Sequence, residues 1–273
     1  MGYKTKIDWC DSSWNPVTGC LHECEYCYAR GIANRFGGTT PPVNGWDHYR
    51  VYHPFDGAKR LYELDYPLLL QKDGTNRKAP YPFSFAPTLH RYRLDQPSKW
   101  SEPRTIFVCS MADLFGEWVP EEWIEEVFKA CEAAPQHRYL FLTKNPNRLN
   151  QLARDGKLPQ QHWYGYTAIN EGMLWSFTHA IDCHIKNLFV SIEPILEPMQ
   201  PCFSTHTPAD WVIIGAETGN RKDKVTPERD WIMNIARECS YSGRPIFMKD
   251  SLRELMGDDF KQEFPWEVNS CEH

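Results

Sequence analysis

The sequence repeats one pattern, in which a short apolar run is followed by a polar loop and then by a stretch with helical periodicity. The run RTIFVCS (residues 104–110) leads to PEEWIEEVFKACEAA, where Trp123, Val127 and Cys131 recur at helical spacing. The run RYLFLTK (residues 138–144) leads to NPNRLNQLARDG in the same way. The runs are continuously apolar rather than alternating, as in strands that are covered on both faces. The pattern therefore predicts βα units around a parallel sheet.

Counted along the chain, this pattern gives six principal strands and one shorter candidate. The remaining runs are HWYGYTAIN, KNLFVSIEP, ADWVIIGAE and the short RPIFMKD, together with an N-terminal strand near residues 14–18. Six or seven strands are too few for a closed eight-stranded barrel. We therefore expect an α/β fold, a partial (β/α)6 open barrel, in a single domain spanning residues 1–273.

Two segments fall outside the pattern. Residues 37–100 are rich in Pro, Tyr, Arg and Asp and lack helical periodicity. They are interpreted as an insertion between the first and second βα units, with a hairpin around PFSFAPTLHRYRL (residues 82–94), and serve either as a lid or as a surface elaboration. Residues 250–273 are interpreted as a C-terminal extension.

Composition narrows the classes of function. No window approaches the roughly 18 consecutive apolar residues of a membrane span, and the N-terminus lacks an apolar core of signal-peptide length. We therefore expect a cytoplasmic protein with no membrane partner. The net charge of −6 disfavours non-specific binding to polyanions. A local basic patch stays open as an alternative, through Arg91 and Arg93 or through convergence of Lys144, Arg148, Arg221 and Lys222.

Three of the ten cysteines stand apart from the rest. Cys20, Cys24 and Cys27 are spaced C-x3-C-x2-C, whereas the other seven are scattered without a C-x2-C pair. The scattered cysteines are expected to be reduced. Those in apolar settings, such as TIFVCS and VFKACEAA, are interpreted as buried small hydrophobic residues. The triplet is a candidate metal site.

Three thiolates are compatible with more than one kind of metal site. Zinc needs a fourth ligand, for which Cys10 and His22 are the nearest candidates, although His22 lies awkwardly between the first two cysteines. A complete ferredoxin-type cluster needs a fourth cysteine at a recognisable spacing, and none follows. A site-differentiated [4Fe–4S] cluster fits better, because three thiolates hold three irons and the fourth iron is left for a small-molecule ligand.

The residues around the triplet carry a resemblance to a known family. C-L-H-E-C-E-Y-C resembles the radical S-adenosylmethionine (SAM) signature, C-x3-C-x-aromatic-C, with Tyr26 at the aromatic position. The motifs WNPVTGC, SMADLFG, LTKNPNRL, SIEPIL and DWVIIGAETG resemble the phage Gp37/Gp68-like radical SAM family (DUF5131-type) across residues 5–249. Departures from the family pattern, in YTAIN, GAETG and FMKDS, fall at strand ends and bear on the substrate more than on the cofactor.

The resemblance implies cofactor ligands near the N-terminus and at the end of the second strand. The three cysteines are implied to hold the [4Fe–4S] cluster, and Tyr26 belongs to the same signature. In the family, the end of the second strand contacts the amino group of the SAM methionine. By position, that region carries Ser110, Met111 and Asp113 here.

Polar residues also end the later predicted strands, where the chemistry of βα barrels collects. Ser191 and Glu193 end the fifth strand and are candidates for the SAM ribose hydroxyls, since a carboxylate accepts two hydrogen bonds well. Lys144 is a candidate partner of the SAM carboxylate or of an anionic substrate. Glu217 is a candidate on the substrate side.

The chemistry implied by the resemblance is reductive cleavage of SAM. An electron from a flavodoxin or ferredoxin gives methionine and a 5′-deoxyadenosyl radical, which abstracts hydrogen from the substrate. The phage association suggests a nucleotide or nucleic-acid base, in DNA modification or repair, with an isomerase, lyase or transferase outcome. Without a further cysteine cluster we expect no auxiliary iron–sulfur centre. One alternative is a binding protein whose fold is stabilised by zinc or by an inert iron–sulfur group. The other is a protein that binds DNA directly without chemistry, which the net negative charge of the chain disfavours.

Overall fold

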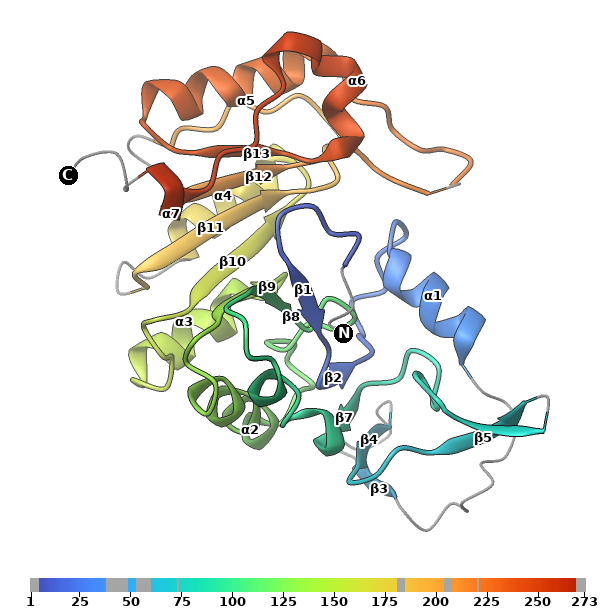
Figure 1. The fold of residues 1–273 in the computed structure, drawn as a ribbon. Coiled ribbons are helices and arrows are strands. Elements are labelled where there is room, and N and C mark those ends of the chain that lie inside the picture. The colour runs from blue at the N-terminus through green and yellow to red at the C-terminus, as the bar shows by residue number, and fades with distance from the viewer. Residues whose placement is uncertain are drawn as a thin grey trace. The chain divides into compact units, whose positions relative to one another are not determined.

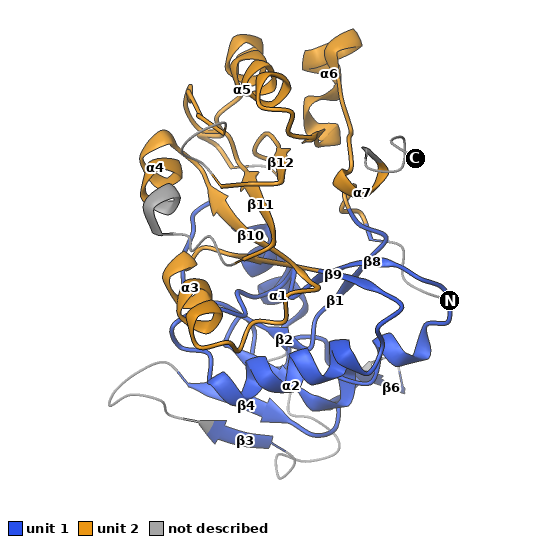
Figure 2. Ribbon diagram, turned by 90° about the vertical axis from the view of Figure 1, so that its left-hand side faces the viewer, with its two compact units in different colours: residues 1–5, 10–139 blue, residues 6–9, 140–273 orange. Residues whose placement is uncertain are grey.

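The computed structural model describes residues 5–37, 49–52, 60–72, 74–180, 185–203, 208–219 and 221–268. The chain divides into two compact units (Figure 2). Unit 1 comprises residues 1–5 and 10–139, and unit 2 comprises residues 6–9 and 140–273. The boundary falls inside one strand, β9 (Arg138–Thr143).

A seven-stranded parallel sheet forms the framework, in the order β1-β8-β9-β10-β11-β12-β13 (Figure 1). Its other strands are β1 (Ser12–Trp14), β8 (Thr105–Val108), β10 (Trp163–Ala168), β11 (Asn187–Ile192), β12 (Trp211–Ile214) and β13 (Ile246–Met248). Every residue of β8, β12 and β13 is buried, as the continuous apolar runs predicted. The predicted open α/β barrel is confirmed, and the run RPIFMKD supplies the seventh strand as β13.

Helices follow the strands from β8 onward, and the two that the sequence predicted, after residues 104–110 and 138–144, are both present. The helices are α2 (Glu121–Glu132), α3 (Pro146–Arg154), α4 (Glu171–Ala180), α5 (Arg229–Tyr241) and the short α6 (Arg253–Met256) and α7 (Pro265–Val268). Helix α2 buries Trp123, Val127 and Cys131, which confirms the helical spacing predicted from the sequence. Cys109 and Cys131 are both buried, as expected of small hydrophobic residues, and burial raises the pKa of the Cys109 thiol to about 12.

The described part of the insertion is built into the core of unit 1. A second sheet has the order β2-β7-β4-β3, with β2 (Val17–Thr18), β3 (Tyr49–Tyr52), β4 (Leu61–Leu64) and β7 (Thr88–His90). A separate hairpin is formed by β5 (Leu69–Lys72) and β6 (Thr75–Lys78). Leu61, Leu64 and Leu89 are fully buried. Strands β4 and β7 of the insertion therefore contribute to the core of unit 1, whereas every residue of β6 is exposed, and the choice between a lid and a surface elaboration stays a prediction.

Prolines explain two differences from the predicted strands. The expected N-terminal strand is split into β1 and β2 on either side of Pro16, and the two halves join different sheets. The expected hairpin at residues 82–94 is a single strand, β7, preceded by turns and followed by a 3-10 helix (Arg91–Arg93). Pro82 and Pro87 lack the N–H donor that a strand ladder requires, so the segment before β7 cannot pair as a second strand.

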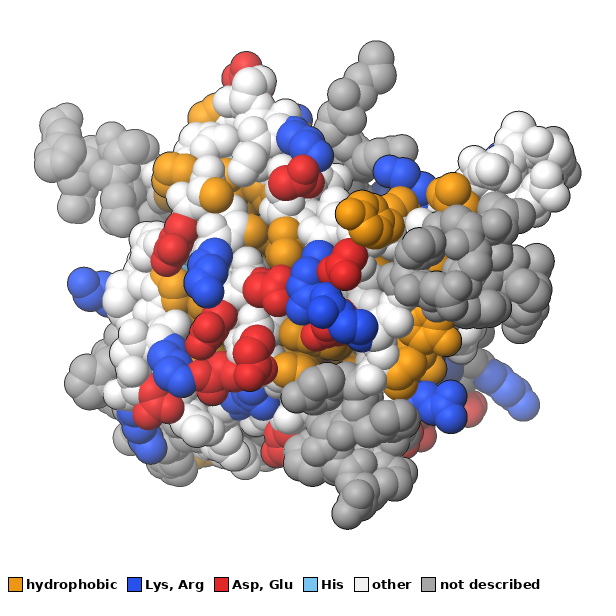
Figure 3. Space-filling model, turned by 90° about the horizontal axis from the view of Figure 1, so that it is seen from below, with side chains coloured by type: hydrophobic (Ala, Val, Ile, Leu, Met, Phe, Trp, Pro, Cys, Tyr) orange, Lys and Arg blue, Asp and Glu red, His pale blue; other side chains and the backbone are white. Residues whose placement is uncertain are grey.

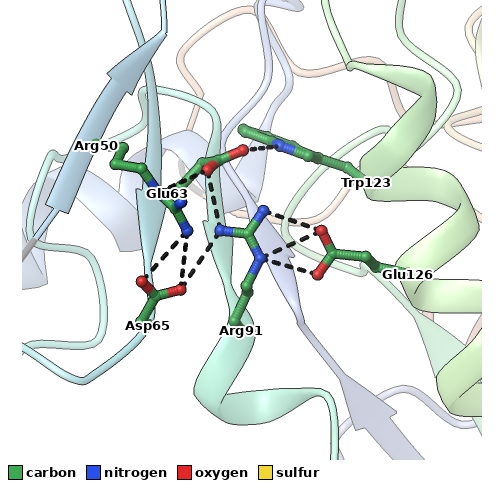
Figure 4. A network of polar contacts seen from close by, with 6 residues as sticks. All are labelled: Arg50, Glu63, Asp65, Arg91, Trp123 and Glu126. Carbon is green, nitrogen blue, oxygen red and sulfur yellow. Dashed lines mark hydrogen bonds and ion pairs between the residues drawn. The ribbon is translucent and has the colours of Figure 1, made fainter.

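A polar network joins the insertion to α2 within unit 1 (Figure 4). Its six members are Arg50, Glu63, Asp65, Arg91, Trp123 and Glu126. The Arg91 guanidinium donates to both oxygens of Glu126 at 2.9 Å and to Glu63 Oε2 at 2.9 Å, while Trp123 Nε1 donates to Glu63 Oε1 at 2.7 Å. Burial acts to raise the pKa of the Glu63 carboxyl, but hydrogen bonds from Arg91 and Trp123 prevail, and the pKa lies below its usual value.

This network bears on the predicted basic patch. Arg91 is neutralised by carboxylates, and the Arg93 guanidinium donates to the carbonyl oxygens of Asn15 at 3.0 Å and Pro80 at 3.0 Å. Acidic and basic side chains are interleaved on the face of the molecule shown in Figure 3. The two arginines therefore make contacts within unit 1, and the basic patch that the sequence left open stays a hypothesis.

The core of unit 2 is aromatic. Trp211 on β12 lies against Trp9, Phe189, Phe247, Phe264 and Trp266, with ring centroids 5.3–6.3 Å apart. Edge and tilted contacts of this kind are the preferred arrangements of aromatic pairs. Much of the high aromatic content therefore serves packing. None of the helices in the described part of the chain has the length and apolar character to span a bilayer.

Candidate cofactor site

The three motif cysteines lie on the loop that leads into α1 (Tyr28–Phe36) in unit 1. Cys27 is the N-cap of α1, where its Sγ accepts a hydrogen bond from the Arg30 N–H at 3.4 Å. The Cys27 N–H donates to the Cys24 carbonyl at 3.2 Å, which turns the loop between these two cysteines. Cys20 and Cys27 pack against the same apolar cluster, which consists of Ala29, Ala33, Phe85 and Met111. All three thiols are half-buried, so they are neither locked in the core nor fully solvated.

Tyr26, the aromatic residue of the motif, lies beside these thiols. Burial raises the pKa of its phenol well above the usual value, and a hydrogen bond and charge interaction with Cys24 add to the effect. Cys27 contributes in the same direction. The side chain therefore lies half-buried against the cysteine loop.

The insertion forms a wall against the start of this loop. Gly19 has φ +88°, and a Cβ at this position would lie 2.3 Å from the Ala86 carbonyl oxygen. The Cys20 N–H donates to the Phe85 carbonyl at 3.2 Å. Only glycine has both the backbone freedom and the small size that this close approach requires. Phe85 and Ala86 thus determine the path of the chain into the first cysteine.

The segment after β8 is tied to the cysteine loop from the other side. Asn15 Oδ1 accepts hydrogen bonds from Ser110 Oγ at 3.2 Å and from the Met111 N–H at 2.9 Å. The Gly19 N–H donates to the Met111 carbonyl at 2.9 Å, and the Tyr28 hydroxyl donates to the Ser110 carbonyl at 2.8 Å. The structure therefore brings Ser110 and Met111 together with the cysteine loop, as their assignment to one site requires.

Asp113 takes part in a contact that sequence reasoning did not anticipate. His22 Nε2 lies 2.7 Å from Asp113 Oδ2, and Asp113 Oδ1 accepts the Phe115 N–H at 3.1 Å. The His22 ring packs edge-on against Trp118, with centroids 4.9 Å apart. Because His22 lies between Cys20 and Cys24, the buried Asp113 carboxylate anchors the middle of the cysteine loop. The structure gives Asp113 a positioning contact, and its predicted contact with SAM stays a prediction.

We expect Asp113→Ala to weaken cluster retention without unfolding the protein. A hydrogen bond to a charged group contributes roughly 1.5–3 kcal/mol, so its loss should free the loop and speed the release of iron to a chelator several-fold. His22→Ala should give the same effect, and the double variant should add little, because both substitutions remove one interaction. Glu102→Ala, which removes an exposed carboxylate elsewhere in unit 1, is the control. Additive losses in the double variant would contradict the pairing.

In unit 2, charged residues that follow β11 and β13 meet across the end of β12, the strand between them. The Lys249 ammonium, after β13, donates to Glu193 Oε1, after β11. A Cβ on Gly215, which follows the intervening strand β12, would lie 2.9 Å from Lys249 Cδ. The glycine thus leaves room for the ion pair to cross β12. Glu193 keeps a second carboxylate oxygen, and the ammonium keeps two more donors, for a ligand.

Two buried hydroxyl groups lie near the ends of β10 and β11. Ser191 on β11 is opposite Thr167 on β10 in the parallel register. Both side chains are buried, and neither Ser191 Oγ nor Thr167 Oγ1 has a hydrogen-bond partner among the residues that the structure describes. Buried hydroxyls are usually satisfied, so each such atom calls for an explanation. Thr167 was missed from the sequence, although its motif YTAIN departs from the family pattern at this point.

The last two predicted residues have different surroundings. Glu217 is buried, and Arg221 donates to its two oxygens at 2.7 and 2.8 Å. This hydrogen bonding lowers the pKa of the Glu217 carboxyl. Lys144 is half-buried after β9, just before Asn145, which caps α3 by accepting the Arg148 N–H. The structure pairs Glu217 with Arg221 and does not test the role predicted for Lys144.

The donor set of the cysteine loop fits an iron–sulfur cluster. Three half-buried thiols lie on one short loop. One of them caps the N-terminus of α1, and a helix N-terminus stabilises negative charge such as that of a thiolate. Among the described residues, no three His, Cys, Asp or Glu side chains are grouped closely enough to hold a single metal ion. The role of the three cysteines as cluster ligands therefore stays a prediction.

Comparison with solved structures defines the class of fold. Two structures of spore photoproduct lyase match, one of a mutant with a cysteine-to-serine substitution and one complexed with dinucleoside spore photoproduct. The identities are 10% and 9%, the TM-scores 0.51 and 0.53, and the matches cover 90% and 91% of this chain and 80% and 79% of the other. The fold is therefore of the radical SAM type. The chain belongs to the family described as "Protein of unknown function (DUF5131)", whose model matches residues 4–255. No curated protein matches the chain.

Proposed function

We propose that this protein is a radical SAM enzyme. It holds a [4Fe–4S] cluster through Cys20, Cys24 and Cys27 and binds SAM at the cluster. The observation that carries the proposal is the cysteine loop itself, with three half-buried thiols at the N-terminus of α1 in a fold of the radical SAM type. Once bound, the cluster and SAM supply a 5′-deoxyadenosyl radical that abstracts hydrogen from a substrate.

The chain's own residues would hold SAM in place and position it. The carbonyls of Ser110 and Met111 each accept one hydrogen bond and keep a second lone pair, which suits the ammonium group of SAM. Tyr26 interacts with Cys24 and Cys27 and would help to position the cysteine loop. In unit 2, Ser191 and Glu193 are proposed for the ribose hydroxyls, with Lys144 and Glu217 proposed for the SAM carboxylate or the substrate. Among the residues that the structure describes, the Ser191 hydroxyl has no hydrogen-bond partner, which supports this assignment because a bound ligand would satisfy it.

We further propose a nucleotide or nucleic-acid base as the substrate. The support is the similarity in fold to spore photoproduct lyase, one structure of which is complexed with a dinucleoside spore photoproduct. Because the net charge is −6, recognition should depend on local contacts rather than on the field of the whole chain.

Anaerobic reconstitution with iron and sulfide, followed by SAM and dithionite, is expected to yield 5′-deoxyadenosine, detected by mass spectrometry. Adding the true substrate class should raise the yield several-fold over the protein alone, so oligonucleotides, mononucleotides and unrelated metabolites are compared. An intact cluster with no 5′-deoxyadenosine would exclude the radical mechanism. Zinc in the purified protein, with unfolding on chelation, would instead support a metal-stapled binding protein.

A further inference from the structure

The backbone around Glu193 in unit 2 is fixed by Gly215. The strands β11, β12 and β13 are neighbours in the sheet, so the residues that follow them lie side by side (Figure 1). The Gly215 N–H donates to the Ile192 carbonyl at 3.2 Å, and the Gly215 carbonyl accepts the Ile195 N–H at 3.0 Å. These two hydrogen bonds hold the chain on both sides of Glu193. The direction in which the Glu193 side chain leaves the sheet is therefore set by its backbone.

The Lys249 side chain reaches Glu193 by passing over Gly215. The Lys249 N–H donates to the Ile214 carbonyl at 2.9 Å, which ties the base of the side chain to β12. A Cβ on Gly215 would lie 2.9 Å from Lys249 Cδ and 3.4 Å from Glu193 Cγ and Cδ. The φ of Gly215 lies outside the left-handed region. Glycine is therefore required here for the room that it gives to the two side chains, and not for its backbone conformation.

The ion pair restricts the Glu193 carboxylate. The Glu193 and Lys249 side chains are 26% and 19% exposed, so salt screens this pair less than an exposed one. Among the residues that the structure describes, neither group has another side-chain partner. A glutamate side chain has three rotatable bonds, and without the ammonium its carboxylate would turn toward water. With Lys249 in place, one carboxylate oxygen is bound and the other is held in one direction.

We propose that Lys249 is a positioning residue of the SAM site, which holds the Glu193 carboxylate so that its second oxygen accepts the ribose hydroxyls. Gly215 belongs to the same arrangement, because it gives the lysine its path. A carboxylate that is already held loses less conformational freedom when the ligand binds, so it binds more tightly than a mobile one. The inference rests on the proposed function, since it concerns how Glu193 acts in that same site.

Lys249→Met in the reconstituted holoprotein removes the ammonium and keeps much of the apolar stem. Equilibrium dialysis should give a Kd for SAM roughly tenfold above that of the wild type, because the hydrogen bond to a charged group is lost. Iron and sulfide per chain should be unchanged, and 5′-deoxyadenosine formation at saturating SAM should stay within about threefold. Lys249→Arg keeps the charge and should recover most of the affinity. Lys186→Met, which replaces an exposed lysine just before β11, is the matched control and should bind SAM as the wild type does.

Three further measurements show whether Lys249 acts through Glu193. Glu193→Ala should raise the Kd by a similar factor, and adding Lys249→Met to it should change the Kd by less than about twofold, because both substitutions remove one interaction. Analogues of SAM that lack the ribose 2′ or 3′ hydroxyl should bind the wild type more weakly and lose little further affinity in Lys249→Met. Gly215→Ala should raise the Kd for SAM several-fold, since its Cβ displaces the lysine stem.

The outcomes are distinguishable. A wild-type protein that holds the cluster but does not bind SAM refutes the proposed function. With SAM bound by the wild type, the inference is overturned if Lys249→Met keeps the wild-type Kd, or if Lys249→Arg binds as weakly as Lys249→Met. It is also overturned if the double variant loses affinity additively, because Lys249 would then contact SAM itself. If circular dichroism shows that Lys249→Met is unfolded, Gly215→Ala takes its place, and a wild-type Kd for that variant overturns the inference.

Discussion

Replacing Cys20, Cys24 or Cys27 with alanine, one at a time, is expected to abolish 5′-deoxyadenosine formation and to remove the cluster absorbance. Each thiolate holds a different iron, and the loop offers no fourth cysteine to take the place of a lost one. The folded protein should survive, since all three side chains are half-buried on the loop and outside the sheet. Iron and sulfide per chain, the near-ultraviolet and visible spectrum and the product yield are measured together, with circular dichroism to confirm folding.

Cys10→Ala and Cys202→Ala are the matched controls for this series. Both wild-type residues are half-buried and lie outside the motif, so both variants should keep the cluster and the activity. Loss of metal in Cys10→Ala would show a four-ligand site and support the zinc staple in place of the radical enzyme. A motif variant with full iron content would contradict the proposed ligand set.

Gly19→Ala is expected to have the largest effect on stability. The new Cβ would lie 2.3 Å from the Ala86 oxygen, 2.4 Å from the Ala86 carbonyl carbon and 2.7 Å from the Phe85 oxygen. All three are backbone atoms, so no side chain can swing away, and φ is +88°. Overpacking and the left-handed backbone conformation of a non-glycine residue together should lower the free energy of unfolding by roughly 3 kcal/mol or more. The urea midpoint should fall, and the variant should retain iron poorly.

Gly156→Ala separates the two contributions to that cost. Gly156 has φ +67°, but a Cβ added there would have nothing within 4 Å, so only the backbone strain applies. The substitution should lower the free energy of unfolding by about 1–2 kcal/mol and leave iron retention unchanged. Equal effects of the two substitutions would show that the backbone of Phe85 and Ala86 moves away from the new Cβ, which would contradict the expected steric clash.

Much of the fold could be predicted because its signals are local. Continuous apolar runs identified the strands of the seven-stranded sheet from β8 onward, and the spacing of Trp123, Val127 and Cys131 identified α2, without knowledge of the tertiary structure. The differences arose where proline decided the pairing. Pro16 divides one expected strand between two sheets, and Pro82 and Pro87 leave β7 without the expected hairpin partner. Strand partners distant in sequence, such as β2 and β7, carry no local signal.

The candidate site shows the same limit. The cysteine spacing is local, and it predicts a candidate ligand loop directly from the sequence. The contacts that hold the loop join residues far apart in sequence: His22 and Asp113 are separated by 91 positions, and Asn15 and Met111 by 96. No pattern in one sequence reports such a pairing. The roles predicted for Lys144, Ser191, Glu193 and Glu217 stay predictions.

The close approach of Ala86 to Gly19 has a consequence for how this family can diverge. We expect the cysteine loop and the segment around Phe85 to change together, although 66 positions separate Gly19 from Phe85 in the chain. A change in the path of one demands a compensating change in the other. Relatives are therefore expected to vary the length of the insertion before Tyr81 freely, and to alter residues 81–86 only together with the approach to the first cysteine.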